Sequence, residues 1–190
     1  MDAPTLGKTL RDATRPDHRR LDHHPLLAPL VRHDLDLTAY ANALAALHAA
    51  QSRAEAIIAQ ALATHCPDYP FTPRLADLEA DLADLGRRPL GLAIAPLAPA
   101  AGPAALMGQL YVLEGSLLGA QVIAYQIART LPQAPHRYFT VRDVEHRWSR
   151  FTQFAVYLCP PLEQEQAMAA ALAMFRFFRE HLDDCQARLG

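Results

Sequence analysis

Apolar residues recur along the chain at the spacing of amphipathic helices, in blocks separated by proline-rich segments. No alternating apolar and polar stretch of useful length competes with this pattern, so the sequence predicts an all-α fold. The apolar series define the expected helices, which run through Leu6–Leu21, Tyr40–Leu62, Leu75–Leu85, Leu106–Ile127, Val141–Phe151 and Leu172–Leu182.

Local signals predict where several of these helices begin and end. Thr38 and Thr140 are the expected N-caps of the second and fifth helices, because a threonine hydroxyl can accept from a free backbone N–H. Gly86 suits the C-terminal end of the third helix, and Pro103 suits the first turn of the long fourth helix. Pro16 lies inside the first helix and predicts a kink or a restart there, because proline lacks an N–H and crowds the preceding turn.

The length of 190 residues fits a single domain covering residues 1–190. The proline-rich connection at 87–103 is too short to separate two domains. Half of the residues are hydrophobic and only eight are glycine, which favours helices over a turn-rich β fold. The three cysteines lie far apart and without a C-x-x-C pair, so neither a disulfide framework nor a thiolate zinc site is predicted.

Charge and hydropathy limit the partners and the location. The formal net charge of −2 provides no overall field for nucleic acid, so no nucleic-acid partner is expected. Lys8, Arg11 and Asp12 stand where a signal peptide would need its apolar stretch, and we therefore expect a cytoplasmic protein. The apolar run at 103–128 is long enough for a membrane span, but Glu114 in its middle predicts a buried core helix and no membrane.

The long fourth helix contains three glycines, Gly108, Gly115 and Gly119. Each costs about 1 kcal/mol of helix stability relative to alanine, so some other interaction must offset that cost. One interpretation is close packing of two helices, which small residues four positions apart permit. The other is a flat ligand lying against exposed backbone, which needs the same absence of side chains. The sequence leaves both open.

His18 stands out among the nine histidines because helical spacing aligns it with Arg11 and Asp22 along one face. A lone histidine on such a helix is most often solvent-facing or packed in the core. It also suits heme iron, with Asp22 or a water holding the second ring nitrogen and Arg11 reaching a propionate. Other catalytic patterns are missing from the sequence: an E-x-x-H di-iron motif, a G-x-S-x-G elbow and a glycine-rich phosphate loop.

Two stretches together resemble the heme oxygenase family. The segment L-R-D-A-T-R-P-D-H-R-R-L-D at 10–22 resembles the proximal helix, with His18 at the iron-ligand position and Arg11 at a propionate-contacting position. The segment L-Y-V-L-E-G-S-L-L-G-A-Q-V-I at 110–123 resembles the distal helix of the bacterial, biliverdin-producing branch, with Gly115 and Gly119 where the helix bends over heme. Weaker similarity surrounds Trp148.

The resemblance implies a single-domain helical bundle that is an enzyme. Heme would be substrate and cofactor, ligated by His18 and cleaved with O2 to biliverdin, CO and ferrous iron. Gly115, Gly119 and water near Ser116 would act on the oxygen side, although mammalian-type relatives have an aspartate at the position of Ser116. Arg150 is a candidate for the second propionate. Electrons would come from an external donor such as a ferredoxin or a flavin reductase.

Two alternatives remain at this point. The first is a heme carrier, store or sensor that retains His18 but lacks productive oxygen chemistry. The second is one of the related helical enzymes of thiamin salvage, which share the architecture without heme and would need a catalytic cysteine or a carboxylate cluster.

Overall fold

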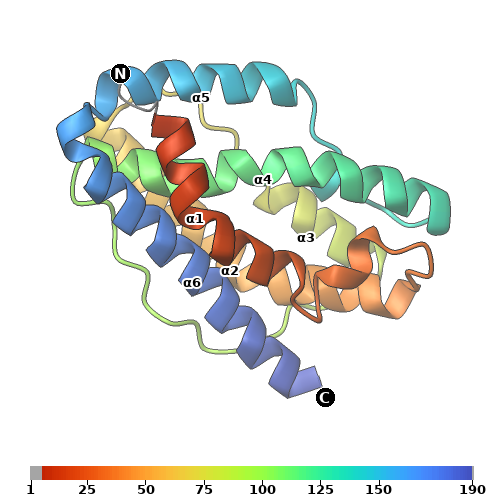
Figure 1. The fold of residues 1–190 in the computed structure, drawn as a ribbon. Coiled ribbons are helices and arrows are strands. Elements are labelled where there is room, and N and C mark those ends of the chain that lie inside the picture. The colour runs from red at the N-terminus through yellow and green to blue at the C-terminus, as the bar shows by residue number, and fades with distance from the viewer. Residues whose placement is uncertain (1–5, 190) are drawn as a thin grey trace.

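The computed structural model describes residues 6–189, and every regular element among them is helical. This confirms the all-α prediction. The chain forms six α-helices in the order α1 (Leu6–Asp22), α2 (Leu37–His65), α3 (Leu75–Asp84), α4 (Pro103–Thr130), α5 (Val144–Leu158) and α6 (Gln164–Leu189) (Figure 1). Three short 3₁₀ turns lie between them: η1 (Ala28–Val31), η2 (Arg137–Phe139) and η3 (Pro161–Glu163).

Helix α4 is the centre of the bundle and packs most extensively against α6 and α5. The contact with α6 is close because Gly108 has no side chain: a Cβ atom there would overlap the carbonyl group of Ala167. Helix α1 runs beside α6, as Figure 1 shows, and is not among the elements packed closely on α4. Helices α1 and α4, which the sequence predicts on either side of a ligand, therefore both pack against α6.

Two of the predicted helix ends are confirmed. Gly86 has a φ of 60°, the left-handed conformation that glycine adopts without strain after a helix. Pro103 begins α4, where its missing N–H has no helical partner to lose. Between these two positions the chain crosses the surface without a helix or strand.

The predicted N-caps are both wrong. The cap of α2 is Asp36, whose carboxylate accepts from the Ala39 N–H at 2.8 Å, so Thr38 falls inside the first turn. Helix α5 begins only at Val144, after Asp143, while Thr140 ends η2 and its hydroxyl donates back to the carbonyl of His136 at 2.8 Å. A hydroxyl that donates to a nearby backbone carbonyl already has its hydrogen bond, and it need not cap a following helix.

Helix α1 continues through Pro16 without a restart. Pro16 is exposed, and so is Asp12, whose carbonyl has no helical N–H donor because residue 16 is a proline. Placement on the solvent side of the helix allows water to hydrogen-bond that carbonyl, which explains why the helix is not broken.

Helix α4 is the one described helix long and apolar enough to cross a membrane by length and composition, and 56% of its most apolar window is buried inside the bundle. Glu114 in its middle is 3% exposed and pairs with Arg147 of α5 at 3.3 Å. This agrees with the prediction of a buried core helix.

Candidate functional site

His18 lies on the exposed face of α1, one turn before the helix ends. Its Nδ1 atom is 2.8 Å from the Oδ2 atom of Asp22, which confirms the predicted partner. Because a carboxylate only accepts, Nδ1 carries a proton, which leaves Nε2 as the nitrogen with the lone pair in the neutral imidazole. No hydrogen bond joins Nε2 to any of the described residues. The imidazole is therefore oriented, with a free nitrogen available to an incoming ligand.

The surroundings of His18 combine an apolar wall with a basic rim. The ring of Phe175 in α6 lies 6.0 Å from the imidazole, centroid to centroid. Arg11 is exposed and lies two helical turns before His18, on the same face of α1. The structure thus keeps Arg11, His18 and Asp22 aligned as the sequence predicts.

The three glycines of α4 have different environments. Close helix packing accounts for one of them, and open backbone that a flat ligand could cover fits the other two. Gly108 is a packing glycine, as its contact with Ala167 shows. At Gly119 a Cβ would meet nothing within 4 Å, and the residue is exposed. At Gly115 the nearest atom would be Cζ3 of Trp148, at the ordinary contact distance of 3.7 Å. Helix packing therefore does not explain Gly115 or Gly119.

The exposed part of α4 around Gly119 is apolar. Leu118, Val122 and Tyr125 expose 45%, 58% and 63% of their surface. Large side chains at that exposure, next to bare backbone, form a surface that a flat apolar ligand can cover. This part of α4 and the His18 face of α1 are the two surfaces that the sequence predicts on either side of such a ligand.

Ser116 is tied to a residue that the sequence analysis missed. Its Oγ atom accepts from Nη2 of Arg74 at 2.8 Å and donates to the Leu113 carbonyl at 2.7 Å. The Arg74 guanidinium is buried, lies 4.6 Å from the centre of the Tyr138 ring and also donates to the Tyr138 carbonyl at 3.3 Å. The chain places a fixed positive charge beside the Ser116 hydroxyl.

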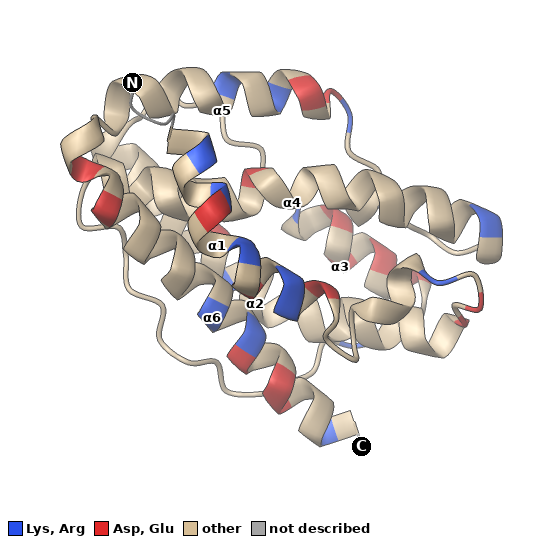
Figure 2. Cartoon of the chain, in the orientation of Figure 1, with Lys and Arg blue, Asp and Glu red and all other residues tan. Residues whose placement is uncertain are grey.

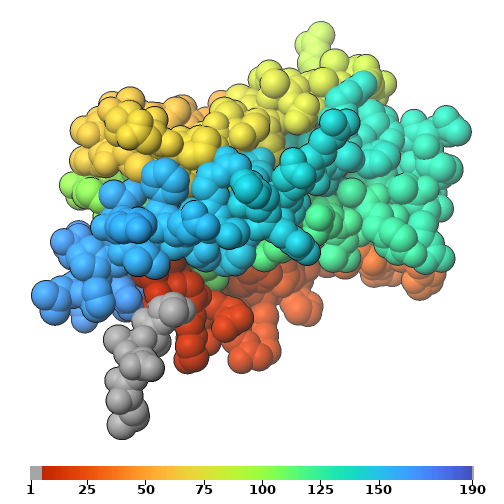
Figure 3. Space-filling model, turned by 90° about the horizontal axis from the view of Figure 1, so that it is seen from above, coloured from red at the N-terminus to blue at the C-terminus, as the bar shows by residue number. Residues whose placement is uncertain are grey.

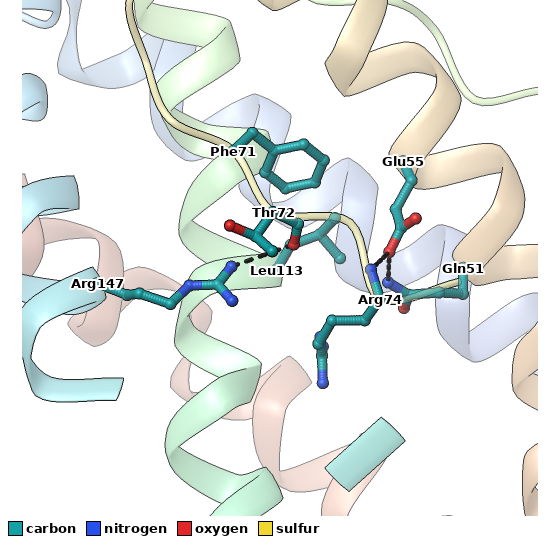
Figure 4. A pocket seen from close by; sticks show the side chains of 7 residues that line it. All are labelled: Gln51, Glu55, Phe71, Thr72, Arg74, Leu113 and Arg147. Atoms are coloured by element: carbon teal, nitrogen blue, oxygen red, sulfur yellow. Dashed lines mark hydrogen bonds between the residues drawn. The ribbon is translucent and has the colours of Figure 1, made fainter. Parts of the chain in front are cut away.

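A buried polar network holds Arg74 in place (Figure 4). Glu55 accepts from the backbone N–H of Arg74 at 2.7 Å and from Nε2 of Gln51 at 2.6 Å. The Tyr138 hydroxyl donates to Gln51 at 2.9 Å, and burial raises the pKa of Tyr138, which keeps that donor protonated. These residues adjoin a cavity of about 10 Å³, the size of one water molecule, which is lined by Gln51, Glu55, Phe71, Thr72, Arg74, Leu113 and Arg147.

Arg150 lies elsewhere. It lines a second cavity together with the segment at 140–143 and the first turns of α5, and none of the other predicted site residues line that cavity. On α5, Arg150 is about half a turn away from Trp148, the residue that faces Gly115. The structure therefore does not bring Arg150 together with His18 and the glycines.

The requirements of the thiamin-salvage alternative are not met by the described residues. Cys66, Cys159 and Cys185 are all buried. Burial raises the pKa of each thiol, to about 11 for Cys185, which leaves them protonated and poorly nucleophilic. Residues 6–189 also contain no group of three or more histidine, cysteine or acidic side chains placed to hold a metal ion.

Comparison with solved structures identifies the fold as that of bacterial heme oxygenases. The NO- and CO-bound heme oxygenase of Neisseria meningitidis superimposes with a TM-score of 0.78 at 23% identity, covering 97% of this chain and 94% of that one. Heme oxygenase-1 of Synechocystis in complex with heme gives 0.73 at 16% identity, covering 98% and 94%. The heme oxygenase of Leptospira interrogans gives 0.73 at 17% identity, covering 95% and 100%.

Sequence comparison adds the family. No protein-family model matches the chain. A heme oxygenase of Xanthomonas campestris pv. campestris is 36% identical over 114 residues, which cover 58% of this chain and 67% of that protein. The chain therefore belongs to the heme oxygenase family, a family of heme-degrading enzymes.

Proposed function

We propose that this protein is a heme oxygenase that binds heme between α1 and α4 and opens the ring to biliverdin, CO and ferrous iron, using O2 and electrons from an external donor. The observation that carries the proposal is the oriented imidazole of His18, with Nδ1 held by Asp22 and Nε2 free. A histidine that binds a metal almost always donates its other ring N–H to a carboxylate, a carbonyl or water. The donor set of α1 therefore fits heme iron.

Helix α4 supplies the opposite face. Gly115 and Gly119 leave backbone open where side chains would occupy the space above a porphyrin, and the apolar side chains beside them would contact the ring. Heme, when bound, would supply the iron that activates O2 as well as the carbon that is oxidised. The glycine backbone would confine that oxygen close to the ring edge and exclude bulk water from it.

The Arg74–Ser116 pair would control protons on this side. The Ser116 hydroxyl directs its own proton to the Leu113 carbonyl, while Arg74 donates to its oxygen. One lone pair of that oxygen remains to accept from a water molecule, which would then be positioned with a second proton to deliver. The nearby guanidinium would stabilise negative charge that develops there. Arg74 would thus supply a charged group, here a positive one, beside Ser116, a position that has no acidic side chain of its own.

Helix α1 would serve the propionates and the electron donor. Arg11 is placed to pair with a propionate from the solvent edge. Lys and Arg residues recur along α1 (Figure 2), and Arg15 and Arg19 are exposed. An acidic donor such as a ferredoxin, or a flavin reductase, would be attracted to this face.

Aerobic turnover distinguishes the enzyme from a carrier, store or sensor. Hemin is added to the purified protein with a ferredoxin and its reductase under air, and the absorption spectrum is followed. The enzyme replaces the heme Soret band with the broad absorption of biliverdin and releases CO. A stable heme complex that never yields biliverdin would support the binding protein instead.

A further inference from the structure

A cavity of about 300 Å³ lies between α3 and α5, and it shares one lining residue, Arg74, with the surfaces proposed for heme. Its walls are the lead-in to α3 with Arg74, the first turn of α3 with Asp77, the segment at 140–143, and the face of α5 that carries His146, Arg147 and Arg150. Figure 3 shows the segment around 140 leading into α5, and α5 lying against the part of the chain that precedes α3. Trp148 and Phe151, the residues of α5 that face α4, are not part of the lining.

The lining is rich in cationic groups, and two of them are uncommitted. Arg147 is bound to Glu114 and to the Thr72 carbonyl, and Arg74 is bound to Ser116 and Tyr138. The ion pairs formed among residues 6–189 include neither Arg142 nor Arg150. A free guanidinium has five donors in a planar fork that matches oxygens of a phosphate group.

The start of α5 adds donors to the same wall. Asp143 precedes the helix in the left-handed conformation, with a φ of 54°, and its side chain forms no cap. The first backbone N–H groups of α5 therefore have no side-chain partner, and their dipoles favour an anion. The uncommitted arginines and the open cavity that they line carry the argument, and the start of α5 agrees with both.

We propose that this cavity binds the phosphate group of a small phosphate monoester, with Arg142 and Arg150 as its principal contacts. Two cationic forks match the charge of a phosphate dianion. The volume lies at the lower end of the range for small-molecule sites, which leaves space for a short hydroxylated group besides the phosphate. Asp77 and Asp143 weaken the attraction for a bare anion but can accept from the hydroxyl groups of an ester.

Isothermal titration calorimetry on the heme-free protein at low ionic strength tests this, and its outcome does not depend on the proposed heme chemistry. Glycerol 3-phosphate, inorganic phosphate and glycerol are titrated separately. The proposal expects binding of glycerol 3-phosphate, weaker binding of inorganic phosphate and none of glycerol. Equal affinity for glycerol 3-phosphate and inorganic phosphate would overturn the proposal of a phosphate ester as the ligand, and would mean an adventitious ion only. No heat change at millimolar concentrations of either phosphate would overturn the site.

Matched variants locate the binding. Arg142→Gln combined with Arg150→Gln should lower the affinity about tenfold, roughly the combined effect of two exposed charge interactions. Arg53→Gln, which removes an exposed arginine on α2, should leave it unchanged. Asp143→Asn should tighten phosphate binding about threefold, by removing one repulsive charge, and asparagine tolerates the positive φ. Equal losses in the Arg53 variant and the double variant, or no gain in Asp143→Asn, would contradict the assignment. Thermal unfolding in phosphate-free buffer verifies that each variant is folded.

Discussion

Gly108 and Gly119 lie in one helix, and the same substitution at each should have opposite effects on stability. At Gly119 an added Cβ meets nothing within 4 Å, so Gly119→Ala gains the helix propensity of alanine, about 1 kcal/mol. For a chain of 190 residues that raises the Tm by about 2–4 °C. At Gly108 the Cβ overlaps the Ala167 carbonyl, and forcing α4 away from α6 should cost about 1–3 kcal/mol, more than the propensity gain.

Scanning calorimetry of the heme-free variants measures these shifts, and aerobic turnover measures the chemistry. Gly119→Leu should stay folded while O2 affinity and biliverdin formation collapse, because its side chain would project where heme is proposed to lie. Gly108→Ala should lose stability while the fraction that remains folded degrades heme normally. A sharp loss of stability in Gly119→Leu, with normal turnover by the folded protein, would show that Gly119 serves helix packing and refute the reasoning.

Three further predictions concern the charged and polar groups. Arg11→Ala should weaken heme affinity about fivefold or less, as expected for a solvent-edge ion pair, without changing the Soret band; a complete loss of binding would contradict this role. Ser116→Ala should leave heme affinity intact and slow biliverdin formation about tenfold, the effect of one hydrogen bond, and an unchanged rate would remove the Arg74–Ser116 pair from the chemistry. Burial lowers the pKa of His24 and His181 below the ordinary value of 6.5, so the neutral forms stabilise the fold fully above pH 6.5 and that stability is lost as the pH falls below it. Unfolding by urea between pH 7 and 5 should show this loss, a smaller loss is expected in His24→Asn, and a pH-independent free energy would disprove it.

The sequence predicts the fold well because helical periodicity and proline punctuation are local signals. Helix ends depend on competing local hydrogen bonds, which explains the errors at Thr38 and Thr140. The first is displaced by Asp36, two residues earlier, and the second by a carbonyl four residues before it. The sequence predicts a kink or a restart at Pro16, and no restart occurs. The effect of the proline depends on which side of the helix faces water, which the sequence pattern does not show.

The candidate site could be predicted only where its residues share one helix. His18 and Asp22 are four positions apart, so periodicity alone places their side chains together. Arg74 and Ser116 are 42 positions apart, and no periodic pattern links the loop before α3 to the middle of α4. The glycines illustrate the same limit, because the sequence pattern does not distinguish Gly108 from Gly119, whereas in the structure α6 packs against Gly108 and none of the described residues packs against Gly119.

The central claim is that His18 binds heme iron. Absorption and electron paramagnetic resonance spectra of the heme complex should show ligation by a neutral imidazole in the wild-type protein and in His23→Ala, which removes an exposed histidine just after α1. In His18→Ala the ligation should be lost, and added imidazole should restore it. Spectra of His18→Ala identical to those of the wild-type complex would contradict the account.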